Sequence, residues 1–343
     1  MTKPPAKKLR VLLLTDENMV PARPRGELEG REAELHKTEY DVRDALQKLG
    51  HEVTYAGVGS ELNVIGRAID DVDPHIAFNL VEQFDGLPHF DQHVVSYLEL
   101  RKQKYTGSNP RGLMIARDKA LTKKILTYHR MPVPRFAVFP PRKRVAATNR
   151  LKFPLFVKSL TEEGSEGISQ ASLVREPDKL LERIAFIHEK TGSPALVEEF
   201  IEGREIYVAV YGNEQLTALP PWELTMSNLP DGAPVIATDK AKWDPSYQKR
   251  IGLKTGPAEL SKDELARLLR ASKRIYKLLG LSGYARLDYR MQENGRFHLL
   301  EANPNPQIAR DEDFANSAKH AGMSYETLLQ KLLTLGLGFS SRP

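Results

Sequence analysis

The chain has 343 residues, of which 41% are hydrophobic and 28% charged. This balance is typical of soluble globular proteins and excludes disordered and fibrous classes, while the length predicts two or three domains. The absence of cysteine excludes disulfides, thiolate nucleophiles and thiolate metal sites.

The formal net charge of +5 is small for this length, and the basic groups near the N-terminus and at 142–144 are short. Such groups usually lie in solvated loops, so we expect no nucleic-acid partner. A basic surface that binds nucleic acid is the alternative. The first apolar run, 11–14, is too short for a signal peptide or a membrane span. We therefore expect a cytoplasmic protein without a membrane partner.

The first third of the chain alternates between short apolar strands and amphipathic helices. We predict a loose tail over 1–9, followed by strands at 10–15, 51–58 and 76–81 and helices at 32–49, 62–69 and 90–100. A β-α-β-α-β order predicts a parallel sheet with helices on its faces. We assign it to an N-terminal domain over 10–112, closed by a short strand at 105–108.

The middle of the chain reads as a small α+β domain over 113–204. Asp118 is a good N-cap for a helix over 119–129. Strands are predicted at 153–159, 168–174 and 195–200, and a helix at 177–190.

We place a C-terminal α+β domain over 205–338. A strand at 205–211 precedes a long polar stretch, 222–259, whose length suggests a functional lid loop. Ser261 and Glu264 form a capping box for a helix that ends at Gly280, and a last helix is predicted at 324–335.

A hairpin over 284–306 is the most informative stretch. Asn294 and Gly295 lie between two strand-like runs, which predicts a two-residue type I′ turn. Counting outward from that turn pairs Asp288 with Glu301 and Arg286 with Asn303, and the alternation of a strand then puts all four side chains on one face.

Two opposed carboxylates repel each other unless a positive group lies between them. Asp288, Glu301 and Asn303 offer only oxygen ligands, the set that suits Mg²⁺ or Mn²⁺ held together with substrate phosphates. The alternative is a solvated surface hairpin in which Arg286 pairs with the carboxylates.

Two further groups could contact a nucleotide. Gly164, Ser165 and Gly167 lie after Lys158 in a turn that could cradle phosphates, although by themselves they favour an ordinary hairpin loop with two glycines. Glu198 and Glu205 bracket a turn from which carboxylates could accept hydrogen bonds from adenine or ribose.

Taken in order, these motifs resemble the ATP-grasp superfamily, in the branch similar to D-alanine–D-alanine ligase. The resemblance runs from about 78 to 333. Its landmarks are Phe78-Asn79-Leu80, Tyr105-Thr106-Gly107-Ser108, Asp118-Lys119, Thr122-Lys123, Val157-Lys158, the 164–167 turn, 198–205, Arg286-x-Asp288, Glu301-Ala302-Asn303 and 321–325.

The resemblance implies a Rossmann-like N-terminal domain, a small central α+β lid and a C-terminal α+β domain, with ATP clamped between the last two. It also implies two Mg²⁺ ions, with Mn²⁺ possible, and small-molecule carboxylate and amine substrates. A homodimer is what the family suggests.

By position, the family's functional residues fall as follows: Lys119, Lys158 and Lys242 on the ATP phosphates, with Gly164 and Ser165 in the phosphate loop; Glu198 and the backbone of Glu199, Phe200 and Ile201 on adenine; Glu205 on ribose; Asp288, Glu301 and Asn303 on the metal ions; Arg286 on the developing charge. The implied reaction passes through an acylphosphate and releases ADP and phosphate.

The segments that would contact the substrate depart from the family. The loop 15–30 lacks the glycine-rich pattern of D-alanine–D-alanine ligases, and Arg310, Asp311, Glu312 and Asp313 replace small residues. We therefore expect substrates other than two D-alanines, with Arg310 on a carboxylate and one of the three acids on an ammonium; a solvated helix start is the alternative. A kinase with a non-amine acceptor, or a nucleotide-binding protein without catalysis, also remains open.

Overall fold

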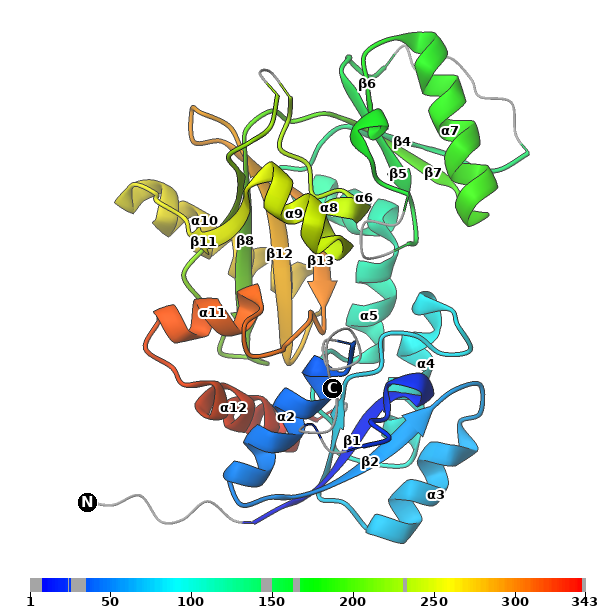
Figure 1. Ribbon diagram of the computed structural model, residues 1–343, viewed down its shortest axis with the longest axis vertical. Helices are drawn as coiled ribbons and strands as arrows, with labels where there is room; N and C mark the ends of the chain where they lie inside the picture. The colour runs from blue at the N-terminus through cyan, green and yellow to red at the C-terminus, as the bar shows by residue number, and fades with distance from the viewer. Residues whose placement is uncertain are drawn as a thin grey trace.

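The computed structural model describes residues 8–23, 25, 35–142, 150–162, 167–230 and 233–340. Three sheets organise these residues (Figure 1). None of the described helices is long and apolar enough to cross a membrane.

The first sheet is parallel, with strand order β2-β1-β3, as the β-α-β-α-β pattern predicts. The predicted strand at 105–108 is only an isolated bridge between Tyr105 and Ala77, and residues 26–34, where a helix was expected to begin, lie outside the description. The elements of this part are β1 (Arg10–Asp16), α2 (Lys37–Lys48), β2 (Glu52–Val58), α3 (Asn63–Val72), β3 (Ile76–Asn79) and α4 (Asp91–Leu100).

The second sheet is antiparallel, with strand order β4-β7-β5-β6, and forms the upper lobe in Figure 1. Its apolar face packs against α7 through Leu155, Val157, Leu180 and Ile184. The elements are α5 (Pro110–Arg117), α6 (Lys119–Tyr128), β4 (Phe136–Phe139), β5 (Leu155–Ser159), β6 (Leu173–Val174), α7 (Pro177–Thr191) and β7 (Ala195–Glu199).

Two predictions for this lobe need correction, and one is confirmed. The strand expected at 168–174 shrinks to β6, because Ser169 caps a 3-10 turn over Gln170–Ser172. Strand β4 was not predicted at all. Asp118 caps α6, as expected, by accepting hydrogen bonds from the backbone N–H groups of Ala120 and Leu121.

The third sheet has strand order β11-β10-β8-β12-β13, with β9 paired to β8. Helix α10 begins at the predicted capping box and covers one face. The opposite face packs in part against α11 and also carries Arg286 and Asp288. The elements are β8 (Arg204–Tyr211), β9 (Thr217–Ala218), β10 (Trp222–Met226), α8 (Asp239–Trp243), α9 (Pro245–Ile251), β11 (Leu253–Pro257), α10 (Lys262–Leu278), β12 (Tyr284–Met291), β13 (Phe297–Pro304), α11 (Asp313–His320) and α12 (Tyr325–Gly338).

The prediction of a lid loop at 222–259 is wrong for most of that stretch. It contains β10 and β11, which pair with each other, and the two short helices α8 and α9. Capping side chains define these helices: Thr238 caps α8, and Asp244 caps α9. Polar composition hid them because caps and short helices are themselves polar.

The β12–β13 turn also differs from the prediction. The Gln292 N–H donates to the Arg296 carbonyl (2.8 Å), and Gly295 alone has the positive φ, 71°. The loop therefore has three residues and ends in a left-handed glycine, and it is not a type I′ turn.

A bulge in β13 restores the predicted register. Between the turn and Leu300, Tyr289 pairs with Leu299. Leu300 itself has no partner in the register, and on its other side Asp288 pairs with Glu301 and Arg286 with Asn303. The longer turn and the bulge each move the register by one residue in opposite directions, so both predicted pairs are correct.

Helix α12 returns to the first sheet (Figure 1). Leu328, Leu332 and their neighbours share one apolar cluster with Leu13 and Phe78 of that sheet. At Gly336 a Cβ would lie 2.2 Å from the Tyr105 carbonyl oxygen, so the close approach of this helix requires glycine.

Candidate active site

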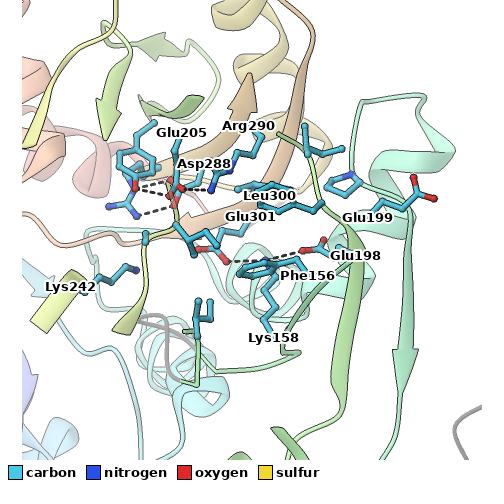
Figure 2. A pocket seen from close by; sticks show the side chains of 18 residues that line it. Phe156, Lys158, Glu198, Glu199, Glu205, Lys242, Asp288, Arg290, Leu300 and Glu301 are labelled. Carbon is cyan, nitrogen blue, oxygen red and sulfur yellow. Dashed lines mark hydrogen bonds and ion pairs between the residues drawn. The ribbon is translucent and has the colours of Figure 1, made fainter. Parts of the chain in front are cut away.

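A pocket lies between the second sheet and the face of the third sheet opposite α10 (Figure 2). Strands β5 and β7 supply one wall, and β8, β12 and β13 supply the other. The predicted residues that line it are Lys158, Glu198, Glu199, Phe200, Ile201, Glu205, Lys242, Arg286, Asp288 and Glu301. Residues from five strands and helix α8, far apart in sequence, thus meet in one place.

A buried ion-pair chain runs from Glu198, at one end of the pocket, to Glu301 of the hairpin. Glu198 lies 2.5 Å from the Lys123 ammonium and 3.3 Å from that of Lys158, which in turn lies 3.7 Å from Glu301. Burial would raise the pKa of Glu198, but the two ammonium groups hold it below its usual value. Burial lowers the pKa of Lys123, although the negative charge of Glu198 acts to raise it.

Apolar side chains flank this chain of charges. The Phe156 and Phe200 rings lie 6.3 Å apart, and Leu300 lines the same pocket. The Leu300 carbonyl accepts a hydrogen bond from Lys123 (2.9 Å). An apolar slot with a few placed polar groups suits a flat heterocycle such as a nucleobase.

Glu205 is held in place on β8. It accepts a hydrogen bond from the Tyr207 hydroxyl (2.8 Å) and pairs with Arg290 (3.0 Å). Arg290 also donates to the carbonyls of Gly203 and Val235 (2.9 and 2.5 Å), so it ties the segment before α8 to this wall.

The hairpin carboxylates lie at the other end of the pocket. Arg286 donates two hydrogen bonds to Asp288 (2.8 and 2.9 Å), and Asn303 donates a third (2.9 Å). The Arg286 guanidinium also stacks over the Tyr207 ring, 4.7 Å from its centroid. Arg286 is thus fixed on both sides.

The pKa values of the two hairpin carboxyl groups are shifted in opposite directions. Burial raises the pKa of Asp288 to about 6, and Glu301 adds to the rise while Arg286 opposes it. Burial would also raise the pKa of Glu301, but Lys158 and the other cations around it lower it to about 2. Asp288 therefore gains most from an additional cation.

The donor set fits a hard cation. Two carboxylates and the Asn303 amide offer oxygen ligands on one face, and Mg²⁺ is commonly held by one or two carboxylates together with phosphates. Within the described ranges, no group of three or more His, Asp or Glu side chains gathers as a metal site. Mg²⁺ bound by one or two carboxylates usually keeps water and phosphate oxygens as its other ligands.

The remaining phosphate candidates lie near this end. Lys119 begins α6 and donates to the Glu162 carbonyl (2.7 Å), and it helps to lower the pKa of Glu301. Lys242, on α8, lines the pocket (Figure 2). Gly164 and Ser165 fall outside the described residues.

The four residues expected to contact substrate lie elsewhere. Arg310 stacks over Tyr325 (4.5 Å) and pairs with Glu326 (3.2 Å), and Asp311 pairs with Lys37 (3.5 Å). Glu312 is the N-cap residue of α11, and Asp313 is its first residue. Their role with substrate stays a prediction, although the contacts of Arg310 are those of a structural residue.

Several residues in or beside the pocket were given no role from the sequence. Phe156 and Arg290 lie two positions from Lys158 and Asp288, so strand alternation could have placed them on the same face. Lys123 follows Lys119 by four residues on one helical face. Leu300 lines the pocket because of the bulge, which has no signal in the sequence.

Comparison with known proteins agrees with this geometry. Residues 126–334 match the family model described as D-ala D-ala ligase C-terminus. The chain is 30% identical to a D-alanine–D-alanine ligase of Nitratidesulfovibrio vulgaris, over 88% of this chain and 92% of that one. It is 32% identical to an uncharacterized protein of Sinorhizobium fredii, over 84% of each chain.

The fold is similar to that of solved ligases as well. A crystal structure of D-alanine–D-alanine ligase from Bacillus anthracis complexed with ATP superposes with a TM-score of 0.73 at 22% identity, covering 96% of this chain and 97% of that one.

Fold and matches together define an ATP-grasp enzyme, a ligase that uses ATP to form a C–N bond from small-molecule substrates. Within that class, the chain belongs to the D-alanine–D-alanine ligase family.

Proposed function

We propose that this enzyme joins a carboxylate to an amine through an acylphosphate, and that its substrates are not two D-alanines. The observation that carries the proposal is the row of charged side chains along the pocket, from Glu198 through Lys158 to Glu301 and Asp288. The order of these side chains along the pocket matches the order of the base, ribose and phosphates along a nucleotide.

The base and ribose would bind at the lobe end. Glu198 and the backbone of Glu199 to Ile201 would accept and donate hydrogen bonds to adenine, with Phe156 and Leu300 on its faces. Glu205 would accept from the ribose hydroxyls, because its carboxylate is already oriented by Tyr207.

The phosphates would bind at the hairpin end, beside Lys119, Lys158 and Lys242. Asp288, Glu301 and Asn303 would hold Mg²⁺, which neutralises phosphate charge when bound. Occupancy by two ions, and use of Mn²⁺, belong to the proposal.

The reaction needs positioning and charge stabilisation more than covalent help from the protein. A substrate carboxylate oxygen attacks the γ-phosphorus and ADP leaves; the amine then attacks the acyl carbon and phosphate leaves. Arg286, fixed by Asp288 and Tyr207, and Lys242 stabilise charge on the transferring group. Arg290 holds the segment before α8 against the pocket and so helps to exclude water.

Two further parts of the proposal concern organisation. We propose the division of the chain into 10–112, 113–204 and 205–338, although α12 packs on the first sheet. A homodimer is proposed from the family alone, and light scattering of the purified protein would test it.

The deciding experiment is ADP release from Mg²⁺ and ATP over pooled amino acids and small carboxylates, with D-alanine as a separate arm and mass spectrometry of the product. We expect an amide from a pool other than D-alanine. A stable phosphorylated product would identify a kinase instead, and D-alanyl-D-alanine as the best product would overturn the substrate proposal. Lys158→Met is the inactive control.

A further inference from the structure

A short irregular segment, 235–238, leads into helix α8; we call it the strap. Ile236 and Ala237 of the strap line the pocket, and Ile236 is buried. Helix α8, which carries Lys242, begins at the next residue. The position of the strap therefore sets the position of Lys242.

Hydrogen bonds join the strap and the start of α8 to both walls of the pocket. On one side the Val235 carbonyl accepts a hydrogen bond from Arg290 of β12 (2.5 Å). On the other side the N–H of Asp239, the first residue of α8, donates to the Ile168 carbonyl ahead of β6 (3.1 Å). The strap thus connects the third sheet to the lobe of the second sheet.

Arg290 links the strap to the ribose end of the pocket (Figure 2). Its side chain is only 5% exposed, and its Nη2 atom lies 3.0 Å from Glu205 and also donates to Val235. Nη1 donates to the Gly203 carbonyl (2.9 Å), and the guanidinium lies over the Phe200 ring, 5.6 Å from its centroid. Because a single nitrogen contacts both acceptors, the Glu205 carboxylate and the strap are fixed relative to each other.

The Glu205 carboxylate has acceptor capacity left for a ribose. A carboxylate can accept about four hydrogen bonds. The Tyr207 hydroxyl donates to Oε1 (2.8 Å), and Arg290 pairs with Oε2. The lone pairs that remain suit the two neighbouring hydroxyls of a ribose, which would hold the carboxylate in the orientation that it has beside Arg290.

We propose that Arg290 is a positioning residue that couples the ribose site to Lys242. Ribose hydroxyls bound to Glu205 favour the conformation in which Arg290 holds the Val235 carbonyl, and the strap then presents Lys242 to the transferring phosphoryl group. A nucleotide without these hydroxyls binds but leaves Lys242 less well placed. This inference rests on the proposed function, since it needs a nucleotide in the pocket with its phosphates beside Lys242.

The first test compares ATP with 2′,3′-dideoxy-ATP, each saturating, with Mg²⁺ and the substrates that give most product. Hydroxyls that serve binding alone change KM, whereas hydroxyls coupled to Lys242 change kcat. We expect kcat to be about 10- to 100-fold higher with ATP, the range that a buried charge-assisted hydrogen bond allows. An equal kcat with the two nucleotides overturns the proposal.

Variants of Arg290 test whether it carries the coupling. Arg290→Lys keeps a positive charge beside Glu205 but loses the planar fork that also reaches two carbonyls, so it should fold. Its ratio of kcat between the two nucleotides should fall to about one, because the coupling is a pairwise effect. Arg290→Met, which removes the charge as well, should give the same ratio.

The matched control is Arg204→Lys. Arg204 lies on β8 beside Glu205 and also uses its fork, donating to Glu223 (2.8 Å) and to the Glu259 carbonyl (3.0 Å), but it does not line the pocket. This variant should keep the wild-type ratio of kcat. If Arg290→Lys keeps the wild-type ratio too, Arg290 does not carry the coupling and the proposal fails.

A second test needs no turnover. Trp243 follows Lys242 on α8 and is 65% exposed, whereas Trp222, the other tryptophan, is 8% exposed. Quenching of fluorescence by acrylamide therefore reports mainly on Trp243. In wild type, ATP with Mg²⁺ should reduce the quenching more than 2′,3′-dideoxy-ATP does, and in Arg290→Lys the two nucleotides should act equally. Equal reductions in wild type overturn the proposal.

The outcomes also separate this proposal from the ligase function. If no amide forms, but the quenching depends on the ribose hydroxyls and on Arg290, the ligase proposal fails and the coupling stands. If amides form with equal kcat from both nucleotides, the coupling fails and the ligase function stands. If calorimetry finds that neither nucleotide binds the full chain, both fail.

Discussion

Asp288 lies opposite Glu301 across the β12–β13 hairpin because Leu300 is an extra residue in β13. The bulge turns Leu300 and Glu301 toward the same pocket. In the proposed binding mode, this single irregularity places one residue beside the base and the other beside the phosphates.

Lys242→Ala should lower kcat at least about 100-fold, because removal of a group that stabilises transition-state charge costs this much. Affinity for ATP, measured by calorimetry, should change far less. Lys240→Ala, on the same helix α8 but outside the pocket lining, is the control and should keep wild-type kcat. Equal losses in both variants would show that the helix matters and the Lys242 ammonium does not.

Glu198→Gln should destabilise the protein by about 3 kcal/mol, because it leaves the buried Lys123 ammonium without its carboxylate and Lys158 with Glu301 alone. The pKa of Lys123 is lowered on folding, so the unfolded chain binds the proton more tightly and stability rises with pH. Urea unfolding at pH 7 and pH 9 should show a smaller loss at pH 9. A loss independent of pH would contradict this account.

Mg²⁺ binding should weaken as the pH falls below about 6, because a proton on Asp288 then competes with the metal. Glu301, whose pKa is lowered to about 2, should not contribute in this range. Titrations at pH 5 and pH 7.5 in two buffers of different ionisation enthalpy count the protons released. In Asp288→Asn, the Mg²⁺ affinity should keep only the pH dependence that protonation of ATP causes. If the Mg²⁺ affinity of the wild type shows the same pH dependence as that variant, Asp288 is not the group whose proton competes with the metal.

Arg310→Ala should cost about 1 kcal/mol of stability, through loss of a partly exposed ion pair with Glu326 and of the stacking on Tyr325. The KM for the accepted amine and carboxylate should stay unchanged if Arg310 is structural. A rise in KM of tenfold or more, at unchanged melting temperature, would instead support the substrate role expected from the sequence.

The sequence predicted the parallel sheet and the facing pairs of the hairpin because alternation and strand order are local signals. The hairpin pairs were correct although the turn was not, since the bulge compensates for the longer loop. Residues 222–259 were misread because their helices depend on the caps Thr238 and Asp244 within a polar segment.

The packing of α12 on the first sheet affects how the chain matures during synthesis. Strand β1 and helix α2 leave the ribosome early, yet the apolar cluster that holds Leu13 and Phe78 is completed only when Leu328 and Leu332 have been translated. The nascent N-terminal unit therefore keeps part of its apolar surface uncovered until nearly the whole chain has been made, and such surface favours aggregation and chaperone binding.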